Sequence, residues 1–185
     1  GWDLPALVGL AEVENRKVLE DLLNFTPLGE ANYEIIHKES PDRRGIDVAV
    51  LYRKDLFTPL DTQFLYVYFP TSPDSRTRDI LYIKGKLGNY DTLHFFVNHW
   101  PSRWGGQKAT EAKRMRAAGI VKNKVDSILK NQPEANIVIT GDFNDYPYDI
   151  SLKDTLHANF DTLKSEGLLN LMIPLAKAGE GSHKY

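Results

Sequence analysis

The sequence of 185 residues contains no cysteine, which excludes disulfide bridges, zinc–thiolate sites and thiol nucleophiles. Its longest apolar runs have the length of strands, so no segment is predicted to span a membrane, and no signal peptide is recognisable. A large excess of charge of one sign is also lacking, because the formal net charge is −2. Binding of a polyanion therefore requires a local basic patch. The compartment stays open, cytoplasmic or exported, and so does the oligomeric state.

Length and composition are those of one globular domain. The chain is 42% apolar and 26% charged, an ordinary composition for a protein of this size. No internal repeat or linker interrupts it, so a single domain is predicted over residues 1–185. Strands and helices alternate, and most predicted strands are β-branched and aromatic. This order predicts an α/β fold with stacked sheets under outer helices.

Individual elements follow from hydrophobic periodicity. The predicted strands are 7–13, 33–37, 47–52, 63–69, 80–87, 92–98 and 136–140, with a hairpin turn at 88–91. The predicted helices run from an N-cap at Asn15 to Leu23 and over 107–131, 151–157 and 161–169, and residues 179–185 form a flexible tail. The long helix carries an apolar stripe of Met115, Ala118, Val121, Val125 and Ile128. Its basic face is either solvated or a contact for nucleic acid, and consists of Lys108, Lys113, Arg114, Lys122 and Lys124.

The main candidate for chemistry is the apolar strand that ends in Gly141-Asp142-Phe143-Asn144. Ligands of α/β proteins bind at the carboxyl ends of strands, and an extended backbone would point Asp142 and Asn144 to one face. A carboxylate that accepts a proton, beside an amide that holds an oxyanion, suits hydrolysis of a phosphate ester. A simple strand-terminal turn is the alternative, since Asp and Asn favour turns.

Two other strands end in polar candidates. Glu12 and Glu14 close an apolar strand, and magnesium often takes one or two carboxylates, with water and substrate phosphate completing its shell. Glu12 is the predicted metal ligand, whereas Glu14 is better explained by the start of the next helix. His99 ends a third strand, before Trp100-Pro101. It is either an acid or phosphate ligand or a structural histidine.

Four stretches of the sequence resemble the endonuclease/exonuclease/phosphatase superfamily, which contains DNase I-like and exonuclease III-like enzymes. Residues 9–13, Gly-Leu-Ala-Glu-Val, resemble the family's Gly-Leu-Gln-Glu-Val strand, with Ala11 in place of Gln. Residues 97–100 resemble its histidine strand, residues 45–53 its second core strand, and residues 141–144 match its Gly-Asp-Phe-Asn element. The resemblance implies an α/β (α+β) DNase I-like four-layer sandwich, with two mixed β-sheets packed face to face and helices outside.

The resemblance also implies the roles of the residues. Asp142 would orient or deprotonate the attacking water, Asn144 would steady the phosphate, and His99 would contact the scissile phosphate. Glu12 would hold Mg²⁺ or Mn²⁺. The expected activity is divalent-metal-dependent hydrolysis of phosphodiester bonds, first of all by a nuclease acting on nucleic acid. A phosphatase or phospholipase-type phosphoesterase, or an inactive binding scaffold, is the alternative.

Basic residues near these motifs are weaker candidates for binding phosphate. Arg78 lies where relatives carry a phosphate-contacting arginine before a strand, although an exposed loop arginine explains it equally well. Arg103 follows His99 and is accompanied by Lys108 and by Trp104, whose ring offers a stacking face. Asp47 is expected at most to support His99.

Two parts of the family pattern are not found: a first strand ending in a metal-binding Asn, and a closing Ser-Asp-His element. His157 and His183 both lack the preceding aspartate. The domain is therefore expected to be truncated at both ends.

Because such catalytic groups act as a unit, residues 1–185 alone are expected to be a weak catalyst or inactive, and a longer form with both elements should be active. Magnesium-dependent hydrolysis of a phosphodiester by the two forms checks this. Robust turnover by the 185-residue chain would contradict it.

Overall fold

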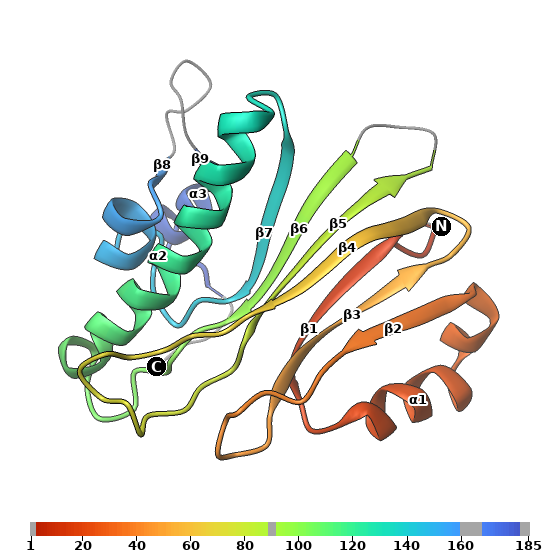
Figure 1. Cartoon of the computed structure of the whole chain (residues 1–185), viewed down its shortest axis with the longest axis horizontal. Coiled ribbons are helices and arrows are strands. Elements are labelled where there is room, and N and C mark those ends of the chain that lie inside the picture. Colours follow the sequence, from red (N-terminus) through yellow and green to blue (C-terminus); the bar gives the residue numbers. More distant parts are fainter. Residues whose placement is uncertain (1–2, 89–91, 160–167, 182–185) are drawn as a thin grey trace.

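Two β-sheets lie face to face between helices in the computed structural model (Figure 1). The structure describes residues 3–88, 92–159 and 168–181. The first sheet is antiparallel and consists, in spatial order, of β1 (Leu7–Val13), β3 (Asp47–Arg53) and β2 (Tyr33–His37). The second sheet consists of β4 (Phe57–Leu65), β5 (Ile80–Leu87), β6 (Thr92–His99) and β7 (Asn136–Asp142). Only the β6–β7 pair of that sheet, among the described strands, is parallel.

Helices cover the two outer faces. Helix α1 (Arg16–Asn24) lies on the first sheet, and its N-cap Asn15 accepts a hydrogen bond from the backbone of Val18 at 3.1 Å. Helix α2 (Gln107–Asn131) lies on the second sheet (Figure 1). Smaller elements follow: η1 (Pro27–Ala31), η2 (Ser151–Thr155), β8 (Ala158–Asn159), β9 (Leu168–Leu169) and α3 (Ile173–Lys177). The helix–sheet–sheet–helix order confirms the predicted four-layer sandwich.

Three apolar clusters fill the spaces between these layers. Side chains of β3 alternate in direction: Val48 and Val50 join Leu81 and Val97 between the sheets, while Ala49 faces α1. A strand buried on both faces reads as a continuous apolar run, which is why β3 is so clear in the sequence. The third cluster lies between the second sheet and α2 and contains Tyr82, Phe96, Trp100, Ala118, Val121 and Val125.

Most predicted elements are confirmed, and three of the strands continue one or two residues further than predicted. The strand predicted at 63–69 is confirmed only over residues 63–65, because β4 spans Phe57–Leu65. A register shift beside Pro59 lets this edge strand carry a proline, and Val67 and Phe69 are buried against α2 without being in a strand. The helix predicted at 161–169 is wrong at its end, which is β9. Its first residues, the turn at 89–91 and the tail at 182–185 lie outside the described residues.

The predicted stripe of α2 is buried at Ala118, Val121, Val125 and Ile128, and half-buried at Met115. Despite its length, α2 is too polar to cross a bilayer, and none of the other helices in the described ranges could do so either.

Close backbone packing brings the carboxyl ends of β6 and β7 together. The parallel register pairs His99 with Asp142, and the Trp100 amide then donates to the Asp142 carbonyl at 2.9 Å. A Cβ atom at Gly141 would lie 2.0 Å from the Asn98 carbonyl oxygen, and the residue has a φ of +125°. Only glycine permits this approach, which fixes where Asp142 emerges.

Gly141→Ala should therefore lower the free energy of unfolding by at least about 2–3 kcal/mol, through backbone strain and overpacking. Gly119→Ala is the matched control, because Gly119 lies in α2 and its Cβ would meet nothing within 4 Å. That control should be stabilising by about 0.5–1 kcal/mol. Urea unfolding measures both, and a neutral Gly141→Ala would contradict the packing described above.

Candidate active site

Three predicted residues meet at one end of the sandwich, each at the end of a strand. His99 Nε2 lies 3.9 Å from Asp142 Oδ2. Glu12 comes from the facing sheet, where β1 packs onto β6 and β7. Its backbone lies within an irregularity of β1 and has a φ of 59°. The negative charges of Asp142 and Glu12 both act on His99, so both carboxylates lie near the histidine.

Asp142 and Asn144 are brought together by a turn. The Asn144 amide donates to Asp142 Oδ1 at 2.9 Å, and Asn144 has a left-handed φ of 52°. Its side-chain Nδ2 donates to the Trp100 carbonyl at 3.0 Å. The predicted extended backbone is wrong here, and the alternative of a strand-terminal turn is correct. The turn itself places both side chains beside the end of β6.

His99 is buried, with 5% of its surface exposed. Burial, and then the positive charge of Arg78, lowers the pKa of His99 to about 4, against the opposing carboxylates of Asp142 and Glu12. At neutral pH the ring is therefore neutral, with one N–H donor and one acceptor nitrogen. Within the described part of the chain, Nδ1 has no hydrogen-bond partner.

Arg78 lies directly behind His99 and is buried, with 3% of its surface exposed. Its Nε donates to the His99 carbonyl at 3.1 Å, its Nη2 donates to the Trp100 carbonyl at 2.6 Å, and its Nη1 lies 3.0 Å from Asp42 Oδ2. Burial would raise the pKa of Asp42, but hydrogen bonds from the Arg44 backbone and from Arg78 lower it overall. The alternative of an exposed loop arginine is wrong, because each nitrogen of the guanidinium binds a backbone carbonyl or the Asp42 carboxylate.

Arg103 also binds the scaffold around the site. Its Nε donates to the Asn144 carbonyl at 2.7 Å, and its Nη2 lies 2.6 Å from Asp149 Oδ2. Asp47 Oδ2 lies 3.0 Å from His37 Nε2, and Asp47 Oδ1 accepts a hydrogen bond from the Ser40 amide. The expectation that Asp47 supports His99 is therefore wrong.

Comparison with known proteins decides the family. A family model described as "Endonuclease/Exonuclease/phosphatase family" matches residues 1–185. The chain belongs to the endonuclease/exonuclease/phosphatase family. No curated protein sequence matches it significantly. The family consists of phosphoesterases, which agrees with a site built from two carboxylates and a histidine.

Solved structures of this family share the fold. Truncated TDP2 of Caenorhabditis elegans has 20% identity and a TM-score of 0.58, with 78% of this chain and 51% of that chain covered. The human Nocturnin catalytic domain, with a bound sulfate anion, has 17% identity and a TM-score of 0.64, with 91% and 64% covered. ANGEL2, described as a 2′,3′-cyclic phosphatase, has 14% identity and a TM-score of 0.62, with 89% and 50% covered. The chain thus spans less than two thirds of the length of each.

Sequence reasoning missed two supports of this family site. Asn98 is fully buried, donates to the Thr140 carbonyl at 3.0 Å and accepts from Trp100 Nε1 at 2.9 Å. Arg114, placed on the solvated face of α2, is also fully buried, and its Nε lies 2.7 Å from Asp145 Oδ2. The prediction for Arg114 was wrong because helical periodicity does not reveal a buried ion pair. The signal for Asn98 was its position between the motif residues Val97 and His99.

Glu12 and Asp142 are the residues that offer oxygen atoms to a metal. The Asp142 side chain is 54% exposed, and the Glu12 carboxylate is exposed, without a hydrogen bond or ion pair among the described residues. No group of three or more His, Cys, Asp or Glu in residues 3–88, 92–159 and 168–181 is arranged to hold a metal ion. Two carboxylates still fit magnesium, which keeps water ligands and takes substrate phosphate oxygens.

The buried His99 predicts a pH dependence of stability. An unfolded histidine titrates near pH 6.5, whereas folded His99 titrates at about 4. Between these values only the unfolded chain binds the proton, so stability falls as the pH falls, by on the order of 3 kcal/mol from this group. His99→Gln should remove most of this dependence. Urea unfolding at pH 7 and at about pH 4.5 measures it, and an equal loss in both proteins would contradict the burial of a neutral ring.

Proposed function

We propose that this protein hydrolyses phosphodiester bonds with the help of Mg²⁺ or Mn²⁺, and that it acts as a nuclease. The observation that carries the proposal is the meeting of His99 and Asp142, 3.9 Å apart, with the Glu12 carboxylate acting on the same histidine. Family membership supports it. So does the sulfate in the Nocturnin structure, because sulfate is a tetrahedral anion like phosphate.

Asp142 is the proposed base for the attacking water. Its Oδ1 is held by the Asn144 amide at 2.9 Å, which leaves Oδ2 on the side of His99. A half-exposed carboxylate in this position can hold a water molecule and accept its proton. Asn144 uses one hydrogen of its side-chain amide on the Trp100 carbonyl. Its second hydrogen is the proposed donor to a phosphoryl oxygen.

His99 is the proposed neutral donor to the phosphate. Because its pKa lies at about 4, the ring donates a hydrogen bond without carrying a charge near neutral pH. Arg78 and Arg103 were expected to contact phosphate, but both bind backbone carbonyls and carboxylates around the site. We assign both to positioning: Arg78 fixes the end of β6, and Arg103 fixes the turn at Asn144.

Glu12 and Asp142 would hold the divalent ion. When bound, such an ion acts as a Lewis acid on the phosphoryl group and lowers the pKa of a coordinated water. The exposed Glu12 carboxylate suits this because nothing in the described part of the chain neutralises it. A phosphatase of the same family is the second candidate, favoured by the description of ANGEL2 as a 2′,3′-cyclic phosphatase.

Asp142→Asn should reduce turnover by a factor of about 10³ or more, as expected for loss of a proton acceptor and ligand, while the fold stays intact because this side chain is largely exposed. Glu12→Gln should raise the magnesium concentration needed for half-maximal rate. Glu14→Gln is the matched control, exposed two residues further on, and should change neither quantity. The measurement is release of product from bis(p-nitrophenyl) phosphate and from a short oligonucleotide over a range of magnesium concentrations.

Near-normal turnover of Asp142→Asn would contradict the proposed base. An equal response of Glu12→Gln and Glu14→Gln would contradict the metal assignment. Hydrolysis of phosphomonoesters with no action on either diester would favour the phosphatase.

A further inference from the structure

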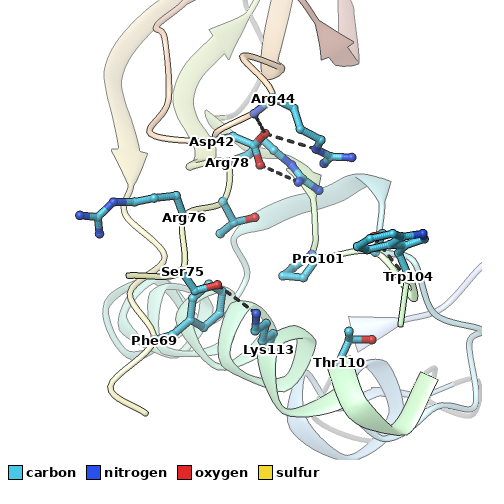
Figure 2. A pocket seen from close by; sticks show the side chains of 12 residues that line it. Asp42, Arg44, Phe69, Ser75, Arg76, Arg78, Pro101, Trp104, Thr110 and Lys113 are labelled. Carbon is cyan, nitrogen blue, oxygen red and sulfur yellow. Dashed lines mark hydrogen bonds and ion pairs between the residues drawn. The ribbon is translucent and has the colours of Figure 1, made fainter. Parts of the chain in front are cut away.

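A cavity of about 180 Å³ lies beside the candidate active site (Figure 2). Four separate segments surround it: the loop before β3, the loop between β4 and β5, the loop after β6 and the amino-terminal half of α2. Pockets for whole drug-sized molecules measure roughly 300–1,000 Å³. The cavity therefore has room for one small group rather than for a complete nucleotide.

The lining of the cavity is strongly cationic. Four basic residues line it, Arg44, Arg76, Arg78 and Lys113, against the single carboxylate of Asp42. The guanidinium of Arg76 points away from the cavity (Figure 2) and donates to the Tyr66 hydroxyl and the Pro73 carbonyl. Asp42 is already bound by Arg78 at 3.0 Å and by Arg44 at 3.4 Å. Lys113 donates to Ser75 Oγ at 2.9 Å, as Figure 2 shows, and an ammonium group has two further donors. An anion is the ligand that would balance this surplus of positive charge.

Thr77 supplies a second and independent indication of a ligand. It lines the cavity, only 4% of its surface is exposed, and its Oγ1 has no hydrogen-bond partner in the part of the chain that the structure describes. A buried hydroxyl without a partner is unfavourable. A phosphate oxygen in the cavity would accept its hydrogen.

The cavity adjoins the active site through Arg78 and has an aromatic rim. Arg78 forms part of its lining and also binds the carbonyls of His99 and Trp100. Trp104 lies on the rim with 92% of its surface exposed (Figure 2). Exposed tryptophan rings beside cationic grooves stack on the bases of single-stranded nucleic acids.

We infer that this cavity binds the phosphate next to the scissile one in a single-stranded nucleic acid, whose base stacks on Trp104. Lys113, Arg44 and the Thr77 hydroxyl bind the phosphate oxygens, and Arg78 connects this subsite to His99. The inference rests on the proposed function and specifies its substrate: the substrate carries at least two neighbouring phosphates. A phosphatase acting on a compound with one phosphate would have no use for the cavity.

Binding measured without metal separates this inference from catalysis. Tetrathymidylate, thymidine 5′-monophosphate and inorganic phosphate are titrated into the protein in the presence of EDTA, by calorimetry. The wild-type protein should bind tetrathymidylate at least about tenfold more tightly than the monophosphate. Lys113→Met and Thr77→Val should each weaken tetrathymidylate binding by about five- to tenfold.

Thr77→Val keeps the shape of the side chain and removes the unpartnered hydroxyl, so it should bind more weakly without losing stability in urea. Trp104→Ala should weaken tetrathymidylate binding and leave the binding of inorganic phosphate unchanged. Lys122→Met is the control, because Lys122 pairs with Asp126 further along α2 and does not line the cavity. It should bind all three probes as the wild-type protein does.

Unchanged tetrathymidylate binding in folded Lys113→Met and Thr77→Val would overturn the inference. Inorganic phosphate that binds as tightly as tetrathymidylate would also overturn it, since the cavity would then be a general anion site. Binding that depends on the cavity, together with no hydrolysis of any diester by either the 185-residue chain or the longer form, would leave the subsite standing and reject the proposed function. Hydrolysis of a diester, with tetrathymidylate binding that the cavity variants do not change, would support the proposed function and reject the subsite.

Discussion

The site depends on the hydrogen bonds and the ion pair that the buried guanidinium of Arg78 forms. Arg78 precedes β5, which runs antiparallel to β6, so it reaches the last residues of β6 and binds the carbonyls of His99 and Trp100. Its third contact, to Asp42, connects the loop before β3 to the same point. Breaking a buried pair leaves an unpaired charge and costs about 3–5 kcal/mol. The cation thus holds elements from both sheets around one histidine.

The electrostatic state of the site follows from this arrangement. The positive charge of Arg78, added to burial, keeps His99 neutral, although Asp142 and Glu12 act in the opposite direction. A neutral ring forms no ion pair with Asp142 or Glu12, so both carboxylates stay available for a cation and for water. The same arginine lines the neighbouring cavity, so the scaffold of the active site is also one wall of the inferred phosphate subsite.

The fold and the residues at the strand ends could largely be predicted from the sequence, because the apolar strands and the long helix have clear periodicities. What the sequence did not predict depends on contacts between distant segments. Arg78 and Arg114 each carry charge and look like surface residues until the chain folds and buries them against Asp42 and Asp145. The turn at Asn144 was predicted only as the alternative to an extended backbone, because Asp and Asn fit either conformation until the hydrogen bond from the Asn144 amide to Asp142 is seen. The cavity beside His99 could not be predicted, since its lining comes from four segments.

The central claim is that Glu12 and Asp142 hold a divalent metal ion beside His99 at the end of the sandwich. Paramagnetic broadening of NMR signals by Mn²⁺ tests it most directly, without requiring activity. The account predicts the strongest broadening at Glu12, His99 and Asp142. His94 should be broadened much less, because the effect falls steeply with distance and His94 lies five residues earlier on β6, about 16 Å away along a strand. Broadening of His94 equal to that of His99, or none at Glu12, would contradict the account.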